Sequence, residues 1–324
     1  MRAADVPAFP LRSFLADVDG FAMLDWRAAE AWLRTIADAS ARSAARVDLH
    51  RAWLAHLRDS LGGAQWLHES DAALVLSSLE PAVVGALSRY VAGARKRIAG
   101  TLGALVGFPA GLKSVVIVLD DEDAYYRYVS TYHSGEGEFA LSSGMFIAGG
   151  CPHFVVRRAD LSSIEPIIAH ELTHSALSHL RLPRWLDEGL AVDTEHRIAG
   201  AHRGLHTPRQ LHAKHVEFWN DETIQQFWSG ESFFRSDDGN MLSYDLARIM
   251  VAQMGRDWPS FERFAAHAAR ADAGASAARE HMELDLGAYV SLMCDREPDE
   301  AWRPGVAAPE PDAAEAASVD SKAA

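Results

Sequence analysis

The chain has few cysteines, a shortage of basic side chains and no long apolar run. Of its 324 residues, only Cys151 and Cys294 are cysteines, which excludes the disulfide framework of a small secreted domain. Lysine and arginine number 31 against 45 aspartates and glutamates, for a formal net charge of −14. This balance argues against a nucleic-acid partner, because binding to phosphates needs a basic face.

Export and membrane insertion are also not expected. Nowhere do eighteen apolar residues run together, as a membrane-spanning helix would require. Residues 1 to 25 mix charges with prolines and lack the basic start and apolar stretch of a signal peptide. We therefore expect a cytoplasmic protein without a membrane span.

What the chain does contain predicts an α+β fold in three parts. Residues 22 to 105 are rich in alanine with apolar residues at helical spacing, so residues 1–105 are predicted to form a helical N-terminal domain. Residues 106–296 combine short β-branched runs with further helices and form the expected catalytic domain. Residues 297–324 are mostly proline, alanine and scattered acids, which predicts a disordered acidic tail.

The most informative segment is His170–His174, with the sequence H-E-L-T-H. Apolar residues at helical spacing on either side predict a helix over residues 163 to 180. Residues four apart on a helix lie one above the other, so His170 and His174 can reach a single small cation. Glu171 then lies beside the metal and does not bind it.

A third ligand is expected from the next helix, which is predicted over residues 184 to 198. Pro183 ends the first helix, and thirteen residues separate His174 from Glu188. The chain runs outward about 9 Å and returns about 7.5 Å at 1.5 Å per helical residue, so Glu188 comes level with the histidines. Two imidazoles and a carboxylate, with the fourth position left to water, are the ligands of catalytic zinc.

Glu195 lies seven residues after Glu188 and therefore on the same helical face. We expect it to accept a hydrogen bond from a ligating imidazole and so to orient that ring. Six further histidines follow the motif, and each is more simply explained as a surface residue than as an additional ligand: His179, His196, His202, His206, His212 and His215.

Together, His170–His174 and the segment Trp185–Ala191, W-L-D-E-G-L-A, resemble the gluzincin class of zinc metallopeptidases, in particular the peptidase MA-like domains. The resemblance covers roughly residues 113 to 265. It implies a zincin-like catalytic domain with a small mixed sheet, a zinc helix and a helical lower lobe. It further implies one zinc ion held by His170, His174 and Glu188, with Glu171 as general base. The spacing between the two motifs is shorter than in the large aminopeptidases of the class.

Upstream of the motif, Ser114–Leu119 reads as a buried strand, and Gly144–Ala148 with His153–Val156 reads as a hairpin. In the resembled class, a strand just before the zinc helix forms a sheet edge to which an extended peptide can add. The large aminopeptidases carry an acid on this strand that binds the free amine of the substrate. The stretch Ser143–Phe146 has no acid, so an endopeptidase is favoured.

A hydrolase of this kind also stabilises the oxyanion that develops during the reaction. Tyr244 matches the position at which many peptidase MA-like domains carry a tyrosine after the zinc helices. An equally simple interpretation is that Tyr244 packs an amphipathic helix.

The prediction is thus a zinc-dependent peptidase that acts on a peptide or protein substrate. Two alternatives remain open. One is a zinc-binding domain without turnover, although a purely structural site would have no need of Glu171. The other is a metallohydrolase dedicated to one partner, with the N-terminal helices as a docking module.

Overall fold

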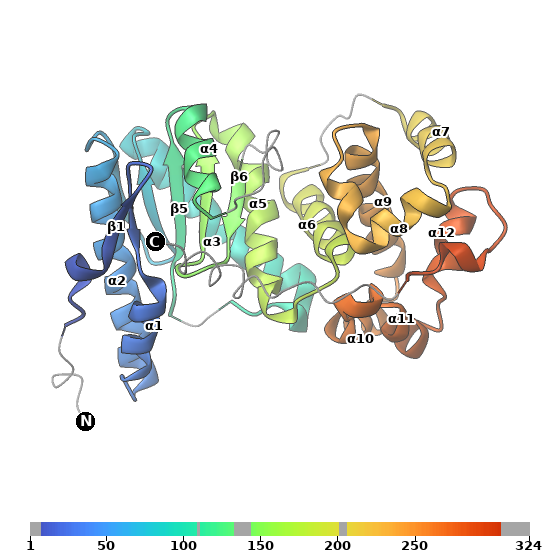
Figure 1. Cartoon of the computed structure of the whole chain (residues 1–324), viewed down its shortest axis with the longest axis horizontal. Coiled ribbons are helices and arrows are strands. Elements are labelled where there is room, and N and C mark those ends of the chain that lie inside the picture. The colour runs from blue at the N-terminus through green and yellow to red at the C-terminus, as the bar shows by residue number, and fades with distance from the viewer. Residues whose placement is uncertain (1–7, 109–110, 133–143, 201–205, 306–324) are drawn as a thin grey trace, which may run out of the picture. The chain divides into compact units, whose positions relative to one another are not determined.

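The computed structural model of the chain describes residues 8–108, 111–132, 144–200 and 206–305 (Figure 1). The chain divides into two compact units, which are interleaved along the sequence. Unit 1 comprises Met1–Ile98 and Phe108–Ser175, and unit 2 comprises Ala99–Gly107 and Ala176–Ala324.

Unit 1 combines helices with two sheets. Its strands are β1 (Leu15–Val18), β2 (Phe21–Leu24), β3 (Trp66–Glu69), β4 (Ala73–Ser77), β5 (Ser114–Leu119), β6 (Gly144–Ile147) and β7 (His153–Arg157). Its helices are α1 (Trp26–Arg34), α2 (Ala39–Ser60), α3 (Pro81–Leu102), α4 (Glu122–Ser130) and α5 (Leu161–Leu177); the last residues of α3 and α5 belong to unit 2. The two sheets are a β1–β2 hairpin and a five-stranded sheet in the order β3-β4-β5-β7-β6.

The five-stranded sheet is mixed. Its central strands β4, β5 and β7 are parallel, and the outer strands β3 and β6 pair antiparallel to their neighbours. All five residues of β4 and five of the six residues of β5 are buried. Helices that cover both faces of a parallel sheet favour such continuous apolar strands over alternating ones. The bounds of β5 confirm the expected strand Ser114–Leu119, and the antiparallel pairing of β6 with β7 confirms the expected hairpin.

One face of this sheet packs against α1, α2 and α4. Leu74, Ile117 and Val155 from the three central strands share a core with the fully buried Trp53 of α2 and Tyr128 of α4. Trp53 also donates a hydrogen bond from its indole to the carbonyl oxygen of Ala22, 2.9 Å away, which satisfies its only polar group inside this core.

The helix that carries the histidine motif, α5, lies against the edge strand β6. A Cβ added at Gly144 of β6 would come within 2.3 Å of the Ile167 side chain of α5. Glycine at this position therefore allows the helix to approach the strand closely. The approach fixes α5 against the sheet.

The prediction of a helical N-terminal domain over residues 1–105 is wrong. Strands β1 to β4 fall within this range, and β4 pairs with β5, which lies beyond the expected boundary at residue 105. The apolar run of five residues, Ala72–Leu76, is too short for its periodicity to distinguish a strand from a buried helical segment. The pairing with β5 over the distant residues 114–117 decides in favour of the strand.

Unit 2 is built from helices in the part that the structure describes. After the end of α3 they are α6 (Arg184–Ala199), α7 (Pro208–Phe218), α8 (Asp221–Ser229), α9 (Asp238–Met254), α10 (Trp258–His267), α11 (Ala275–Met282) and α12 (Leu286–Met293). Aromatic side chains form much of its core: Trp185 contacts Phe227, Trp228 and Phe264, with ring centroids 5.9 to 6.3 Å apart. No helix among the described residues has both the length and the apolar character needed to cross a membrane.

The prediction of a disordered tail from residue 297 is wrong for its first part. Residues Glu300–Trp302 form a short 3-10 helix, and Trp302 is 1% exposed. The indole of Trp302 donates to Asp221, and its carbonyl oxygen accepts from the indole of Trp228, each at 2.9 Å. Burial of this large side chain supplies the apolar area that the rest of the tail lacks. Residues 306–324 lie outside the described part.

Candidate metal centre

Helix α5 presents the two motif histidines on the face opposite its buried side. Ile164, Ile168 and Leu172 are fully buried, whereas the two histidines are half-buried. The helix thus has one flank packed in the core and one flank from which imidazoles can reach a ligand. Its boundaries agree with the predicted helix to within a few residues.

Six residues, 178–183, connect α5 to α6. Ser178–Leu180 form one turn of 3-10 helix, and Arg181 takes a left-handed backbone conformation with φ of 51°. Arg270 donates a hydrogen bond from Nε to the carbonyl oxygen of Leu182, 3.0 Å away, and so holds the end of this connection. Pro183 then precedes the first residue of α6.

The W-L-D-E-G segment of α6 is built around packing positions. Trp185 is fully buried, and its indole donates to the carbonyl oxygen of Ala273 at 2.9 Å. Leu186 is fully buried as well. A Cβ at Gly189 would lie 2.6 Å from the carbonyl oxygen of Ala247, so only glycine allows α6 and α9 to approach so closely. These neighbours anchor the turn of α6 that carries Glu188.

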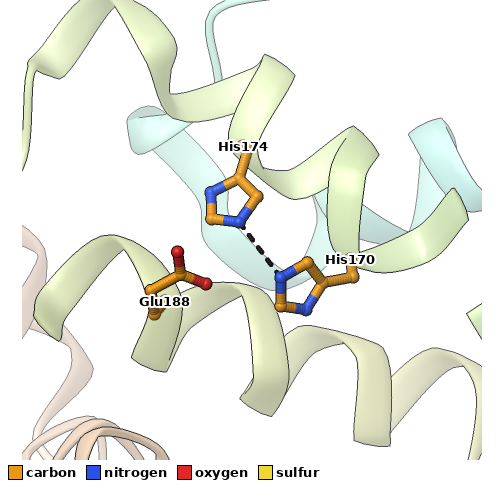
Figure 2. Close-up of side chains that lie close together, drawn as sticks. All are labelled: His170, His174 and Glu188. Atoms are coloured by element: carbon orange, nitrogen blue, oxygen red, sulfur yellow. Dashed lines mark hydrogen bonds between the residues drawn. The ribbon is translucent and has the colours of Figure 1, made fainter. Parts of the chain in front are cut away.

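The three predicted ligands converge. His170, His174 and Glu188 each offer one ligand atom, and these atoms all lie within 4.8 Å of one another. Figure 2 shows the two imidazoles turned toward each other, with the Glu188 carboxylate facing them from the neighbouring helix. This group could hold a metal ion, as the sequence predicted.

The spacing of the donor atoms fits a small tetrahedral cation. The Nε2 atoms of His170 and His174 lie 3.1 Å apart, and one imidazole donates a hydrogen bond to the other. Two nitrogens bound to one tetrahedral zinc at 2.0–2.1 Å would be about 3.3 Å apart. Glu188 is 8% exposed, so its carboxylate is largely removed from competing water. Two neutral nitrogens and one carboxylate oxygen are also the donor set that suits zinc.

The remaining predicted site residues lie on the same two helices and on α9. Glu171 is 8% exposed, which gives a carboxylate next to His170 a largely dry surrounding. Glu195 is half-buried, two turns after Glu188 on α6. Tyr244 lies in α9, and its ring makes an edge contact with Phe233 at 5.1 Å between centroids. Their expected roles stay predictions.

Among the other histidines, His215 is not the surface residue that was expected. It is 4% exposed, its Nδ1 accepts from the Trp219 indole at 2.9 Å, and its Nε2 lies 3.0 Å from Asp245. Since Nδ1 accepts, the proton is on Nε2 and is donated to Asp245. His202 lies outside the described residues. Nothing in the sequence around His215 indicates this network, because Asp245 is thirty residues away.

Sequence reasoning also missed Arg184, the first residue of α6. Its Nη1 lies 3.6 Å from Oε1 of Glu188, one turn away. The signal was present, because a cation four residues before a carboxylate on a helix is placed to interact with it.

Comparison with known proteins adds no relative: no protein-family model and no curated protein sequence matches the chain.

Proposed function

We propose that the chain is a zinc-dependent peptidase that cleaves within peptide chains. The observation that carries this proposal is the convergence of one donor atom each from His170, His174 and Glu188 within 4.8 Å. Glu171 follows His170 directly in the chain and is itself buried. A site that only held the fold together would have no use for a buried carboxylate next to the metal ligands.

The residues present suit the chemistry of peptide hydrolysis. A zinc ion held by the three ligands would supply a Lewis acid and lower the pKa of water at its open position. Glu171, 8% exposed, would accept a proton from that water and pass it to the nitrogen of the leaving amine.

Two further residues complete the proposal. Tyr244 would donate a hydrogen bond to the oxyanion that develops on the substrate carbonyl. Glu195, on the same face of α6 as Glu188, would accept a hydrogen bond from a ligating imidazole and so fix the orientation of the ring.

A peptide substrate is supported by the position of β6. Among the described strands, β6 is an outer strand of the five-stranded sheet and directly precedes β7 and the zinc helix. In the resembled class of peptidases, an extended substrate adds to an outer strand at this place in the sequence. The absence of an acid in the β6 sequence, Gly144–Ile147, removes the group that would bind a free amine, which favours an endopeptidase.

The test combines elemental analysis with cleavage of a mixed peptide library. We expect one zinc per chain, cleavage that a chelator abolishes, and recovery when zinc is returned. One tightly held zinc with no cleavage of any peptide would favour a zinc-binding domain without turnover, or an enzyme dedicated to one partner. Absence of zinc from a chain purified without chelator, and failure to take up added zinc, would contradict the proposal entirely.

A further inference from the structure

Arg184 of α6 is a cation close to the predicted metal ligand Glu188 on the same helix. Its Nη1 lies 3.6 Å from Oε1 of Glu188, and its side chain is 42% exposed. This separation exceeds the usual N–H···O distance of about 3.2 Å or less. The attraction between Arg184 and Glu188 is therefore Coulombic, and Nη1 does not form a hydrogen bond with Oε1.

The guanidinium is held in place by contacts with Phe234 and Gly230. Its central carbon lies 4.5 Å from the centroid of the Phe234 ring, in a cation–π contact. The methylene part of the side chain passes over Gly230, where an added Cβ would come within 3.0 Å of Cδ. A guanidinium stacked on an aromatic face keeps its N–H donors in its own plane, where they can form a paired contact with a carboxylate.

Metal binding would change the electrostatic surroundings of this side chain. Glu188 lies close enough to balance part of the charge of Arg184. A dication bound to the same carboxylate would take up much of that negative charge. Arg184 would then present a positive charge, pre-organised on Phe234, next to the reacting groups.

We propose that Arg184 binds a carboxylate of the substrate on a residue adjacent to the bond that is cleaved. This inference rests on the proposed function and adds a preference to it. One extended residue spans about 3.3–3.6 Å. This length is similar to the 3.6 Å between Nη1 of Arg184 and Oε1 of Glu188, so a carboxylate one residue from the reacting carbonyl is at a suitable distance to meet Arg184. The carboxylate can be the C-terminus of the substrate or an aspartate or glutamate side chain.

The overall charge of the protein cannot produce this preference for a carboxylate, because its sign is wrong. With a formal net charge of −14, the long-range field of the chain disfavours anionic ligands. A probe that binds more tightly when it carries a carboxylate must therefore find a nearby cation.

The test measures binding, so it does not depend on turnover. Three dipeptide hydroxamates are titrated calorimetrically into the zinc-loaded full chain: one with a free C-terminal carboxylate, the same compound as a C-terminal carboxamide, and that carboxamide with a glutamate side chain. We expect at least one carboxylate probe to bind about tenfold tighter than the neutral carboxamide, a typical gain for a charge-assisted contact. Which of the two does so identifies the source of the carboxylate.

Variants then assign the preference to one residue. Arg184→Gln should abolish the preference while zinc stoichiometry stays at that of the wild type, and Arg184→Lys should retain part of it. Arg197→Gln is the matched control, because Arg197 of the same helix also pairs with a carboxylate one helical turn away. Its Nε lies 2.7 Å from Oδ2 of Asp193. This variant should keep the full preference.

The outcomes separate this inference from the proposed function. Equal binding of charged and neutral probes by the wild type, or an unchanged preference in Arg184→Gln, would overturn the role of Arg184 alone. Weaker zinc binding in Arg184→Gln, with all probes weakened equally, would show that Arg184 only positions Glu188 and would also overturn it. Failure of the wild type to bind zinc would overturn both.

Discussion

Gly189 of α6 lies so close to Ala247 of α9 that a Cβ would come within 2.6 Å of the Ala247 carbonyl oxygen and 2.8 Å of the Val251 side chain. The backbone oxygen cannot move without shifting α9. The glycine beside Glu188 therefore has a packing role that its place in the motif does not reveal.

Gly189→Ala should consequently destabilise the protein, although alanine is the better helix former. We expect a loss of about 1–3 kcal/mol in the free energy of unfolding, the usual cost of overpacking a tight contact, and weaker zinc binding. Gly93→Ala is the control, because Gly93 lies within α3 with no atom within 4 Å of an added Cβ. That variant should gain up to about 1 kcal/mol. Urea denaturation checks both, and equal effects would contradict the steric argument.

The metal site makes a second prediction. His174→Ala removes one of two imidazoles whose Nε2 atoms lie 3.1 Å apart, so the variant should lose most of its zinc. Glu188→Ala should weaken zinc binding as well, since the buried carboxylate supplies the only charge of the donor set. Elemental analysis after dialysis measures both. Stoichiometric zinc in His174→Ala would remove that residue from the ligand set, and His267→Ala, at an exposed position, serves as the control.

Glu171→Gln separates metal binding from turnover. Glutamine has nearly the same shape as glutamate and cannot accept the proton, so zinc content should stay at one per chain while the rate of peptide hydrolysis falls about 10²–10⁴-fold. The same preparation is assayed for zinc and for cleavage. Retained turnover would remove the assignment of Glu171 as general base without affecting the ligand assignment.

The pair of helices that forms the site was predictable from sequence, whereas several long-range contacts were not. His170, His174 and Glu188 belong to one continuous stretch, Leu161–Ala199, so helix geometry and one turn suffice to bring them together. Strand β4 and Trp302 depend on partners elsewhere in the chain: β4 pairs with β5, and Trp302 binds Asp221. Local propensity contains no information on such partners.

The same limit explains what was missed at the site itself. Arg184 interacts with Phe234, fifty residues later in the chain, and that ring contact is invisible to any local pattern. His215 was expected at the surface because isolated histidines usually lie there, but its buried position follows from Trp219 and the distant Asp245.

Tyr244→Phe tests the oxyanion role. The substitution keeps the ring that contacts Phe233 at 5.1 Å, so the fold and zinc content should not change. If the hydroxyl donates to the oxyanion, kcat should fall about 10²–10³-fold with little change in KM, because that hydrogen bond forms only in the transition state. Unchanged kcat would leave Tyr244 as a packing residue of α9.

Two buried histidines in unit 1 predict sensitivity to acid. His50 is 2% exposed and His153 is fully buried, and burial lowers the pKa of His50 to about 3 and that of His153 to about 4. Neither ring nitrogen of His50 has a hydrogen-bond partner among the described residues. In His153, Nδ1 donates to the Cys151 carbonyl oxygen, and Nε2 of the neutral ring accepts from the Tyr128 hydroxyl. Both rings are therefore neutral in the folded protein.

The sign of the pH dependence follows. Above pH 6.5 both histidines are neutral in the folded and the unfolded chain, so their contribution is fully present. As the pH falls below 6.5, the unfolded chain takes up protons that the folded chain does not. The free energy of unfolding then drops by about 1.4 kcal/mol per pH unit for each histidine, until about pH 4 for His153 and about pH 3 for His50. Urea denaturation at pH 7 and pH 5 should differ by roughly 4 kcal/mol from these two groups.

His50→Leu should remove half of this slope, because leucine fills the site without a titrating group. Zinc release at low pH affects wild type and variant alike, so the difference between their slopes isolates His50. His267→Gln, at an exposed position, should retain the wild-type slope. Identical slopes in His50→Leu and wild type would mean that His50 is protonated as readily in the folded protein as in the unfolded chain, against its burial beside the edge of Trp26.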